Sequence, residues 1–364
     1  MPAHNANNER IKRQYFSWLK EAKRHSEATV DDVAKAIADF EEDTRFRDFR
    51  LFRHEQAVAF KKRLAERQSQ KTGAKLSKAT MHATLAHLRR FFQWLAGQPG
   101  FKSRLRYSDA EYFSLSEKDS RVATARRPKS FPTIEQVKHV LTIMPTSTEI
   151  QRRNRALLAF VLLTGARDSA VASMRLKHID LSAQSVLQDA REVKTKFSKT
   201  FTTYFFPVGE EVRQIVEQWV RYLREERLWG NDDPLFPATE VVGGTSQHFH
   251  AAGLKREQWR SADPIRSIFR EAFETAGLPY FNPHSLRNTL VQLGEKHCRT
   301  PEEFKAWSQN LGHEDVLTTF YSYGYVAPQR QGELIQALGS PRAPQTTDPD
   351  AIADAIVRRL SGNA

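Results

Sequence analysis

The sequence has a single cysteine, Cys298, among its 364 residues, so it has no internal disulfide. This excludes the small disulfide-stabilised secreted proteins and is typical of a reducing compartment. The longest apolar run, at 156–163, is far too short to span a bilayer. Residues 1–14 contain no apolar segment of the kind found in secretion signals. We therefore expect a cytoplasmic protein, associated with the nucleoid if it binds DNA, and no membrane partner.

Motifs for nucleotide and metal chemistry are also missing. The chain contains no Walker sequence, no CxxC pair and no HExxH motif. The "QHFH" stretch at 247–250 has two histidines without further ligands nearby, which indicates a loop, not a metal site. No carboxylate cluster suggests a two-metal nuclease. We expect no metal and no cofactor.

Acidic residues are scarce in one part of the chain. The formal net charge is +13, and residues 51–130 carry 18 Lys and Arg against 6 Asp and Glu, whereas the rest of the chain is close to neutral. Such segregation indicates a module that binds a polyanion. The alternative is a solvated basic surface without a partner. A basic membrane-binding patch is disfavoured because no amphipathic anchor or lipidation motif accompanies it.

The first 115 residues have the pattern of helices. Thr29 is a plausible N-cap of one helix, and another is expected from Ser77 to Gly97. The apolar residues of the second helix keep a spacing of three or four and form one core face: Met81, Leu85, Leu88, Phe92 and Leu95. The basic residues outside this face, with those of the following linker, are the expected contacts to DNA phosphates: Lys78, His87, Arg89, Arg90, Arg126 and Arg127.

A second domain is expected after an extended linker at 119–131. Thr133 and Gln136 have the spacing of a capping box, and an apolar helix ends at Gly165. The clear β signal lies between 186 and 208, and helices are expected at 209–228, 264–276, 283–297 and 301–310. This divides the chain into a helical domain at 1–118, a second domain at 132–338, and a flexible tail at 339–364 that ends in a short amphipathic helix.

Five basic or imidazole residues stand at structurally informative places. Arg167 follows the buried apolar helix, and Lys194 lies in the turn-prone "VKTKFSK". His284 and Arg287 are three apart at the start of a helix with Pro283 as its first residue, a favourable place for a phosphate. His313 follows a turn. Each has an ordinary alternative as a surface or helix-end residue, and the three tyrosines that follow His313 can be core aromatics.

In this order, "TGAR", "VKT", "PHSLRNT" and "LGHEDVLTTFYSYG" resemble the four boxes of the tyrosine recombinase (phage integrase) family. The resemblance covers roughly 5–336. It implies a mainly α protein: a helical, SAM-like core-binding domain that clamps DNA, and a mixed α/β catalytic domain with a small antiparallel sheet. The near-neutral catalytic domain would close a C-shaped clamp around a duplex held by residues 51–130.

The resemblance also implies an active site. Arg167 and Lys194 match the family's first arginine and its hairpin lysine, and His284 with Arg287 match the H-x-x-R box. His313 matches the histidine of "LGH". The nucleophile usually stands nine residues later, where this chain has Ser322. Tyr323, directly before Gly324, is the implied nucleophile, with Tyr321 as the first alternative and Tyr325 as the second. Two further departures are Ala170, where the family often has an acidic residue, and Asn288, where it often has histidine.

The function implied is that of a site-specific recombinase or integrase, which cuts and rejoins DNA through a 3′-phosphotyrosyl intermediate for a mobile element. Its partners would be double-stranded DNA and three further copies in a homotetramer on paired sites, with accessory DNA-bending proteins as further candidates. Two alternatives stay open. One is a nicking-closing enzyme like type IB topoisomerases, and the other is a catalytically silent DNA-binding protein.

Overall fold

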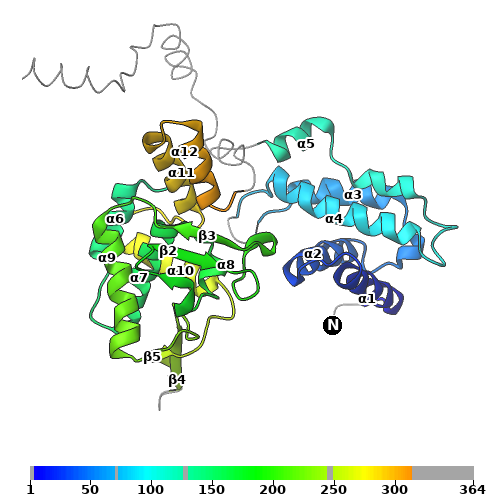
Figure 1. Cartoon of the computed structure of the whole chain (residues 1–364). Coiled ribbons are helices and arrows are strands. Elements are labelled where there is room, and N and C mark those ends of the chain that lie inside the picture. Colours follow the sequence, from blue (N-terminus) through cyan, green and yellow to red (C-terminus); the bar gives the residue numbers. More distant parts are fainter. Residues whose placement is uncertain (1–3, 70–72, 126–129, 244–248, 314–364) are drawn as a thin grey trace, which may run out of the picture. The chain divides into compact units, whose positions relative to one another are not determined.

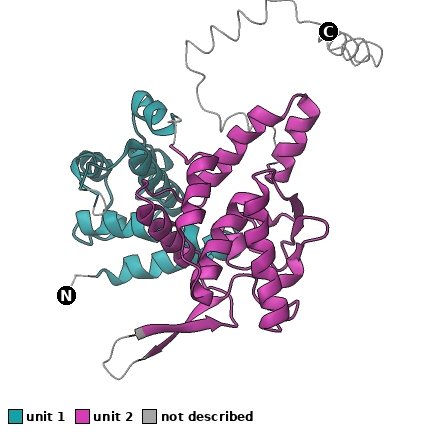
Figure 2. Ribbon diagram, turned by 90° about the vertical axis from the view of Figure 1, so that its left-hand side faces the viewer, with its two compact units in different colours: residues 1–127 teal, residues 128–364 magenta. Residues whose placement is uncertain are grey.

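The computed structural model describes residues 4–69, 73–125, 130–243 and 249–313. The chain forms two compact units, Met1–Arg127 and Pro128–Ala364, shown in Figures 1 and 2. The boundary between them falls inside the linker expected at 119–131. In the part of the chain that the structure describes, no helix is long and apolar enough to cross a membrane.

Unit 1 is helical, as the sequence predicts. In chain order its elements are α1 (Ala6–Glu21), α2 (Glu27–Asp43), the 3₁₀ helix η1 (Phe49–Leu51), α3 (His54–Glu66), α4 (Lys78–Ala96), the 3₁₀ helix η2 (Tyr107–Phe113) and α5 (Glu117–Thr124). Helix α4 packs against α2, α3, η2 and α5. All five apolar residues predicted for its core face are buried, and Phe92 contacts the rings of Phe52 and Phe113.

Two boundaries in unit 1 differ from the prediction. Helix α2 begins at Glu27, because Ser26 and not Thr29 is its N-cap; the Ser26 side chain accepts from the Thr29 N–H. Residues 117–124 are helical, where an extended linker was expected to begin at 119. Ser116 caps this short helix through the Asp119 N–H, and Glu117 pairs with Arg121 one turn later. Local capping thus offsets the low apolar content of this segment.

Unit 2 is built around the apolar helix α7 (Glu149–Thr164), whose residues 156–164 are all buried. The other helices pack with it into one core: α6 (Ile134–Ile143), α8 (Asp168–Val171), the 3₁₀ helix η3 (Leu176–His178), α9 (Glu210–Arg221), the π-helical turn η5 (Tyr222–Glu226), α10 (Asp263–Thr275), α11 (Ser285–His297) and α12 (Pro301–Asn310). The 3₁₀ helix η4 (Lys196–Ser198) has no buried residue. The capping box predicted at Thr133 is present, and Thr300 forms another at the start of α12.

The predicted β region forms a three-stranded antiparallel sheet in the order β1 (Ile179–Asp180), β2 (Ser185–Gln188), β3 (Phe201–Tyr204). Strands β2 and β3 pair from Ser185 with Tyr204 to Gln188 with Phe201. A long connection, residues 189–200, joins them. Figure 1 shows β3 on the side of the sheet that carries α11 and α12.

A second, two-stranded sheet was not predicted. Strands β4 (Ala238–Gly243) and β5 (Phe249–Lys255) form an antiparallel hairpin that extends from the body of unit 2 in Figures 1 and 2. Its sequence is rich in Gly and Ala and lacks the alternation of β-branched residues that marks a strand. The hairpin is anchored from outside: the buried Arg153 of α7 donates to the carbonyl of Pro237 and to Thr239.

Candidate functional site

The carboxyl end of α7 fixes the backbone at Arg167. The Thr164 hydroxyl donates to the carbonyl of Phe160 and accepts from the Ala166 N–H. Gly165 ends the helix with φ +61°, a left-handed conformation that favours glycine. Arg167 then becomes the N-cap of α8 and is half-buried. Burial lowers the pKa of its guanidinium below its usual range, because the charged form loses hydration.

The start of α11 presents His284 and Arg287 differently from the prediction. Regular helical hydrogen bonding begins at Ser285, two residues after Pro283, which was expected to be the first helical residue. The preceding residues form a tight turn in which the Asn282 side chain accepts from the Ser285 N–H. His284 is consequently exposed at the N-cap, whereas Arg287, one turn further, is only 4% exposed.

Arg287 connects three segments that are far apart in the sequence. Its Nη1 donates to the carbonyl of Gly165 at 2.5 Å, and its Nη2 donates to the carbonyl of Leu311. Nη2 also lies 3.0 Å from Nε2 of His313. These contacts use three of the five N–H groups of a guanidinium. Burial, and then the neighbouring charge of Arg167, lower the pKa of Arg287 to about 9.

His313 is held as a neutral imidazole. Arginine has no acceptor atom, so Nε2 of His313 must accept the hydrogen bond from Arg287 and the ring proton resides on Nδ1. Burial is the largest cause that lowers the pKa of His313 to about 4, followed by the positive charges of Arg287, Arg167 and His284. The structure therefore brings four of the predicted residues, from three chain segments, into one electrostatic neighbourhood.

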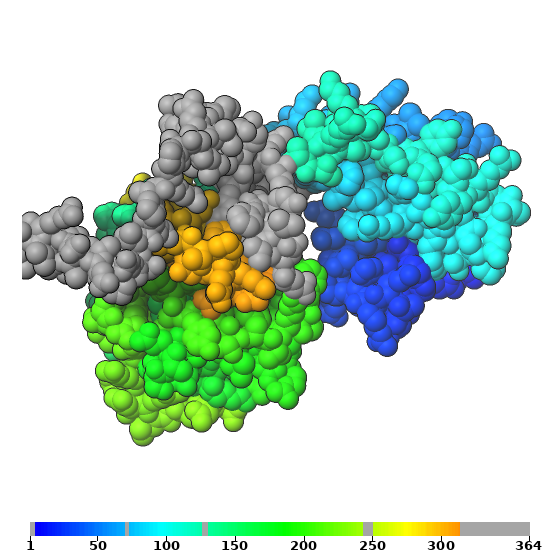
Figure 3. All heavy atoms as spheres, turned by 45° about the horizontal axis from the view of Figure 1, so that its top comes forward, coloured from blue at the N-terminus to red at the C-terminus, as the bar shows by residue number. Residues whose placement is uncertain are grey.

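The turn that carries His313 is fastened to strand β3. The Asn310 side chain accepts from the Tyr204 N–H at 2.7 Å and donates to the Tyr204 carbonyl at 2.9 Å, as a neighbouring strand would. The Thr203 hydroxyl donates to the Asn310 carbonyl. Gly312 has φ +69°, and a Cβ atom at this position would lie 2.6 Å from the Phe201 ring. In Figure 3 the orange atoms around residue 310 accordingly lie against green atoms from the middle of the chain.

Lys194 lies in the long connection between β2 and β3, not at a tight hairpin tip. Its side chain is exposed. Its backbone N–H donates to Oγ of Ser173 at 2.8 Å, and its carbonyl accepts from Oγ of Ser169 at 3.4 Å. Both serines lie within six residues of Arg167, so the lysine segment is attached next to the first arginine.

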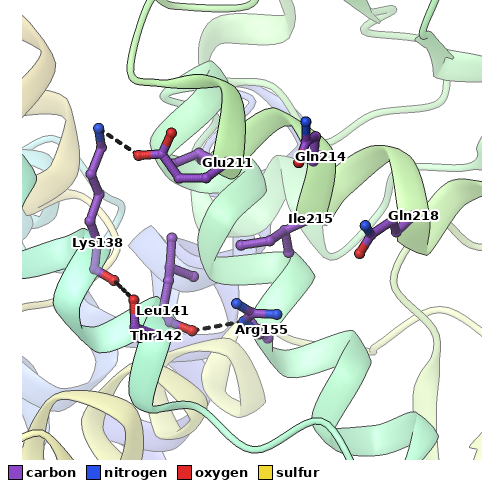
Figure 4. Close-up of a pocket in the computed structure, with 9 residues that line it drawn as sticks. Lys138, Leu141, Thr142, Arg155, Glu211, Gln214, Ile215 and Gln218 are labelled. Atoms are coloured by element: carbon purple, nitrogen blue, oxygen red, sulfur yellow. Dashed lines mark hydrogen bonds and ion pairs between the residues drawn. The ribbon is translucent and has the colours of Figure 1, made fainter.

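A hollow elsewhere on unit 2 has no catalytic character. It lies between α6, α7 and α9 (Figure 4), and its charged groups are already bonded to protein. Lys138 pairs with Glu211 at 2.7 Å, and Arg155 donates to the carbonyl of Leu141. None of the predicted catalytic residues lines it.

The predicted DNA contacts on α4 do not form a single surface. Lys78 pairs with Asp119 at 3.1 Å, and Arg89 pairs with Glu111 at 3.1 Å. His87 is half-buried on another side of the helix; burial, and then the nearby charge of Arg90, lower the pKa of its imidazole. Arg90 is exposed. The remaining candidates, Arg126 and Arg127, lie outside the described residues, as do Tyr321 and Tyr323.

Sequence reasoning missed the polar residues that fix the site. Ser169, Ser173 and Asn310 each hold a predicted residue or its segment in place, yet none belongs to one of the recognised motifs. Their partners lie 21 to 106 residues away in the chain. No local pattern connects residues at such separations.

Known proteins share both the sequence pattern and the fold. The model of the phage integrase family matches residues 132–330, more than half of the chain. The tyrosine recombinase XerC of Lactobacillus leichmannii is 24% identical over 318 residues, which cover 85% of this chain and 92% of that protein. The tyrosine recombinase XerD of Proteus mirabilis is 27% identical over 266 residues, which cover 71% of this chain and 72% of that protein.

Solved structures show the same architecture at lower sequence identity. A lambda integrase (75–356) dimer bound to a COC′ core site has a TM-score of 0.60 at 13% identity, covering 88% of this chain and 97% of the other. The Tn1549 transposon integrase in complex with transposon right end DNA has a TM-score of 0.59 at 15% identity, covering 91% and 99%. With the family match and the four boxes in order, the chain belongs to the phage integrase family of tyrosine-type site-specific DNA recombinases.

Proposed function

We propose that this protein cuts and rejoins duplex DNA through a 3′-phosphotyrosyl intermediate. The observation that carries the proposal is the contact of Arg287 with the "LGH" turn. A buried guanidinium binds Leu311 and His313, with Arg167 and His284 close enough to shift the pKa of His313. The next residues of the chain lead to Tyr321 and Tyr323. This concentration of basic side chains suits the binding of an anionic DNA phosphate that is attacked by a tyrosine.

Each group has a role that its chemistry suits. Arg167 and the remaining N–H groups of Arg287 would bind the non-bridging oxygens and stabilise the charge of the five-coordinate transition state. His313 would donate from Nδ1 to the same phosphate. A tyrosine has an ordinary pKa of about 10 and needs a base, for which the exposed His284 is placed at a helix start. Lys194 would protonate the departing 5′-oxygen.

The phosphotyrosyl link preserves the energy of the broken bond, so rejoining would require neither a nucleotide nor a metal. A 5′-hydroxyl from a second duplex attacks the link and turns cleavage into strand exchange. We propose that the protein does this for a mobile element, as a tetramer on paired DNA sites. The similarity to the Tn1549 transposon integrase supports this role, while the similarity to XerC and XerD supports recombination more generally.

A nicked suicide substrate tests the mechanism. The 5′-hydroxyl leaves on a short diffusing fragment, so the covalent adduct accumulates and appears as a slower band on a denaturing gel. Tyr323→Phe is expected to abolish the adduct, because the phenolic oxygen is removed, and Tyr321→Phe is expected to retain it. The reverse result would assign the nucleophile to Tyr321. If both variants still form the adduct, or if the wild type forms none, the mechanism is rejected.

The same preparation separates the alternatives. A nicking-closing enzyme would relax supercoiled plasmid without pairing two sites, whereas a recombinase yields products that join two labelled duplexes. A silent DNA-binding protein would shift labelled DNA on a native gel but form no adduct. Recombinant products in the wild type, lost in both Arg167→Ala and Arg287→Ala, are the expected outcome.

A further inference from the structure

The connection that carries Lys194 contacts the rest of unit 2 near its middle and is exposed at its tip. Within 189–200, most side chains that the structure describes are half-buried or exposed, and the Phe197 ring is 76% exposed. Phe197 and Ser198 both have positive φ, which non-glycine residues adopt at a cost. Val193, only 2% exposed, inserts into the core directly before Lys194. The connection therefore docks at Val193 and Lys194, whereas its tip is solvent-exposed.

Two serines hold the backbone of Lys194 at this docking point. The Lys194 N–H donates to Oγ of Ser173 at 2.8 Å. Oγ of Ser173 in turn has the carbonyls of Ala170 and Ser169 within 3.0 and 3.2 Å as acceptors for its own proton. The hydroxyl proton therefore points toward these carbonyls, and a lone pair of Oγ is left to accept from the Lys194 N–H. Oγ of Ser169 donates to the carbonyl of Lys194, so both backbone polar groups of the lysine are bonded to α8 and the turn after it.

The attachment is rigid because Ser173 itself is immobilised. Its side chain is buried, with 5% exposure, and its carbonyl accepts from the Gln258 side chain. Helix α8 begins directly after Arg167, its N-cap. A displacement of the lysine segment relative to Arg167 therefore requires breaking the bond between Lys194 and Ser173.

We propose that Ser173, assisted by Ser169, is a positioning residue that sets the place of the Lys194 ammonium relative to the phosphate bound by Arg167. The inference rests on the proposed role of Lys194 as proton donor. In the cleavage step the tyrosine oxygen forms a bond to phosphorus as its proton passes to His284. The bond from phosphorus to O5′ breaks, and the Lys194 ammonium gives its proton to O5′ and becomes a neutral amine. Ser173 contributes by keeping that donor within reach.

The positioning role of Ser173 is tested by comparing the normal substrate with one whose leaving group needs no proton. The rate of adduct formation is measured with the suicide substrate and with the same duplex carrying a 5′-bridging sulfur at the scissile phosphate. A thiolate departs without protonation, so a misplaced donor slows only the oxygen substrate. Ser173→Ala is expected to slow the oxygen substrate roughly 10- to 100-fold, as small misplacements of catalytic groups do. It should leave the sulfur substrate within about twofold of the wild type.

Controls separate this inference from the general mechanism. Lys194→Ala must show a larger loss on the oxygen substrate and the same recovery with sulfur; without that recovery, the donor role of Lys194 itself fails. Ser185→Ala removes another buried serine hydroxyl of unit 2 and should leave both rates unchanged. Ser173→Thr, which keeps the hydroxyl, should restore the oxygen rate.

Two outcomes would overturn the role of Ser173 while leaving that of Lys194 intact. One is a Ser173→Ala protein that is equally slow on both substrates, which is the behaviour of a general structural defect. The other is a protein with normal rates on both. Thermal unfolding of each variant is followed in parallel, and Ser169→Ala, which removes a longer and weaker bond, provides a milder variant if Ser173→Ala does not fold.

Discussion

The protonation of His313 is set first by its burial and then by its contact with Arg287. A buried imidazole that accepts from a guanidinium and has Arg167 nearby resists a second proton, so its pKa falls to about 4 from the usual 6.5. A DNA phosphate in the same pocket would add negative charge and stabilise the protonated ring. We therefore predict that DNA binding raises the pKa of His313.

Titration by NMR of the imidazole carbon-bound protons, with His313→Gln for assignment, checks this prediction. In the DNA-free protein the His313 resonance should titrate near pH 4, and on the DNA complex of the Tyr323→Phe protein it should titrate at higher pH. The pKa shift of His313 also makes the stability of the folded protein depend on pH, in a defined direction. The unfolded chain binds the proton below about pH 6.5 and the folded one below about pH 4, so stability falls as the pH decreases through that window. A titration near 6.5 without DNA would contradict the buried contact.

Gly312 offers a second test at the scale of one residue. It has φ +69°, and a Cβ atom there would lie 2.6 Å from the Phe201 ring. Gly312→Ala should destabilise unit 2 by about 2–5 kcal/mol, the sum of backbone strain and overpacking. Gly277→Ala is the matched control, because Gly277 has φ +70° and open space where the Cβ would be. The control should cost only the strain, about 1–2 kcal/mol.

Denaturant unfolding of the two variants measures the difference between them. Equal losses would mean that the Phe201 contact is not tight. Phe201→Leu combined with Gly312→Ala should recover part of the loss if the contact is the cause.

At this scale the sequence identified the chemically distinctive residues but not their partners. Arg167, Arg287 and His313 were recognised because they occur in short motifs of fixed order. That Arg287 is buried and bonded to Gly165 and Leu311 did not follow, because these bonds join positions 122 and 24 residues apart. Motifs report which groups are present, whereas the folded backbone determines which donors a phosphate can still reach.

Among the elements, α12 and β3 form the joint on which the site depends. Asn310 mimics a strand residue, since its amide exchanges two hydrogen bonds with the backbone of Tyr204. Leu311 and His313, in the turn that follows, both accept from Arg287. The sheet therefore supports the segment that leads to the tyrosines.

Replacing Asn310 tests this joint. Asn310→Ala removes both bonds and should cost about 1–3 kcal/mol of unit 2 stability. It should also slow adduct formation about tenfold, because the turn shifts relative to Arg287. DNA affinity, measured on a native gel, should change little. Gln309→Ala, the exposed neighbour on the same helix, is the control and should behave as the wild type. Equal loss of DNA affinity and cleavage would show that the effect is not local to the turn.

The elements were predictable where the pattern is local and strong. The carboxyl half of α7, residues 156–163, is apolar on all sides and α12 has a complete capping box, and both helices were found at the expected places. The β4–β5 hairpin was missed because its stability comes from outside the segment, through Arg153 and through Glu149, which accepts from the Leu254 N–H. Such tertiary bonds leave no periodic signal in the strands themselves.

For the whole molecule, the location of charge is more informative than its total. The net excess lies in 51–130, yet the structure pairs some of these cations with acids of the same unit. Lys78 and Arg89 are held by Asp119 and Glu111, whereas Arg90 is exposed and has no ion pair among the described residues. Composition predicted a polyanion-binding module. It did not predict which basic side chains must break an ion pair with Asp or Glu before they can contact a phosphate.

The salt dependence of DNA binding distinguishes the cations that are paired with acids from the exposed Arg90. Affinity for a nonspecific duplex is measured between about 50 and 200 mM salt, where each phosphate contact contributes about 0.9 to the slope of log K against log salt. If Arg90 meets a phosphate, Arg90→Ala should reduce the slope by about 0.9. Glu111→Gln removes the carboxylate that holds Arg89 but keeps an acceptor for the neighbouring Gln93. This variant should bind DNA more tightly at every salt concentration, because Arg89 no longer has to break its ion pair with the carboxylate of Glu111 before it contacts a DNA phosphate. Unchanged affinity in Glu111→Gln, with a reduced slope in Arg90→Ala, would restrict the DNA contacts of α4 to the side of the helix that carries Arg90.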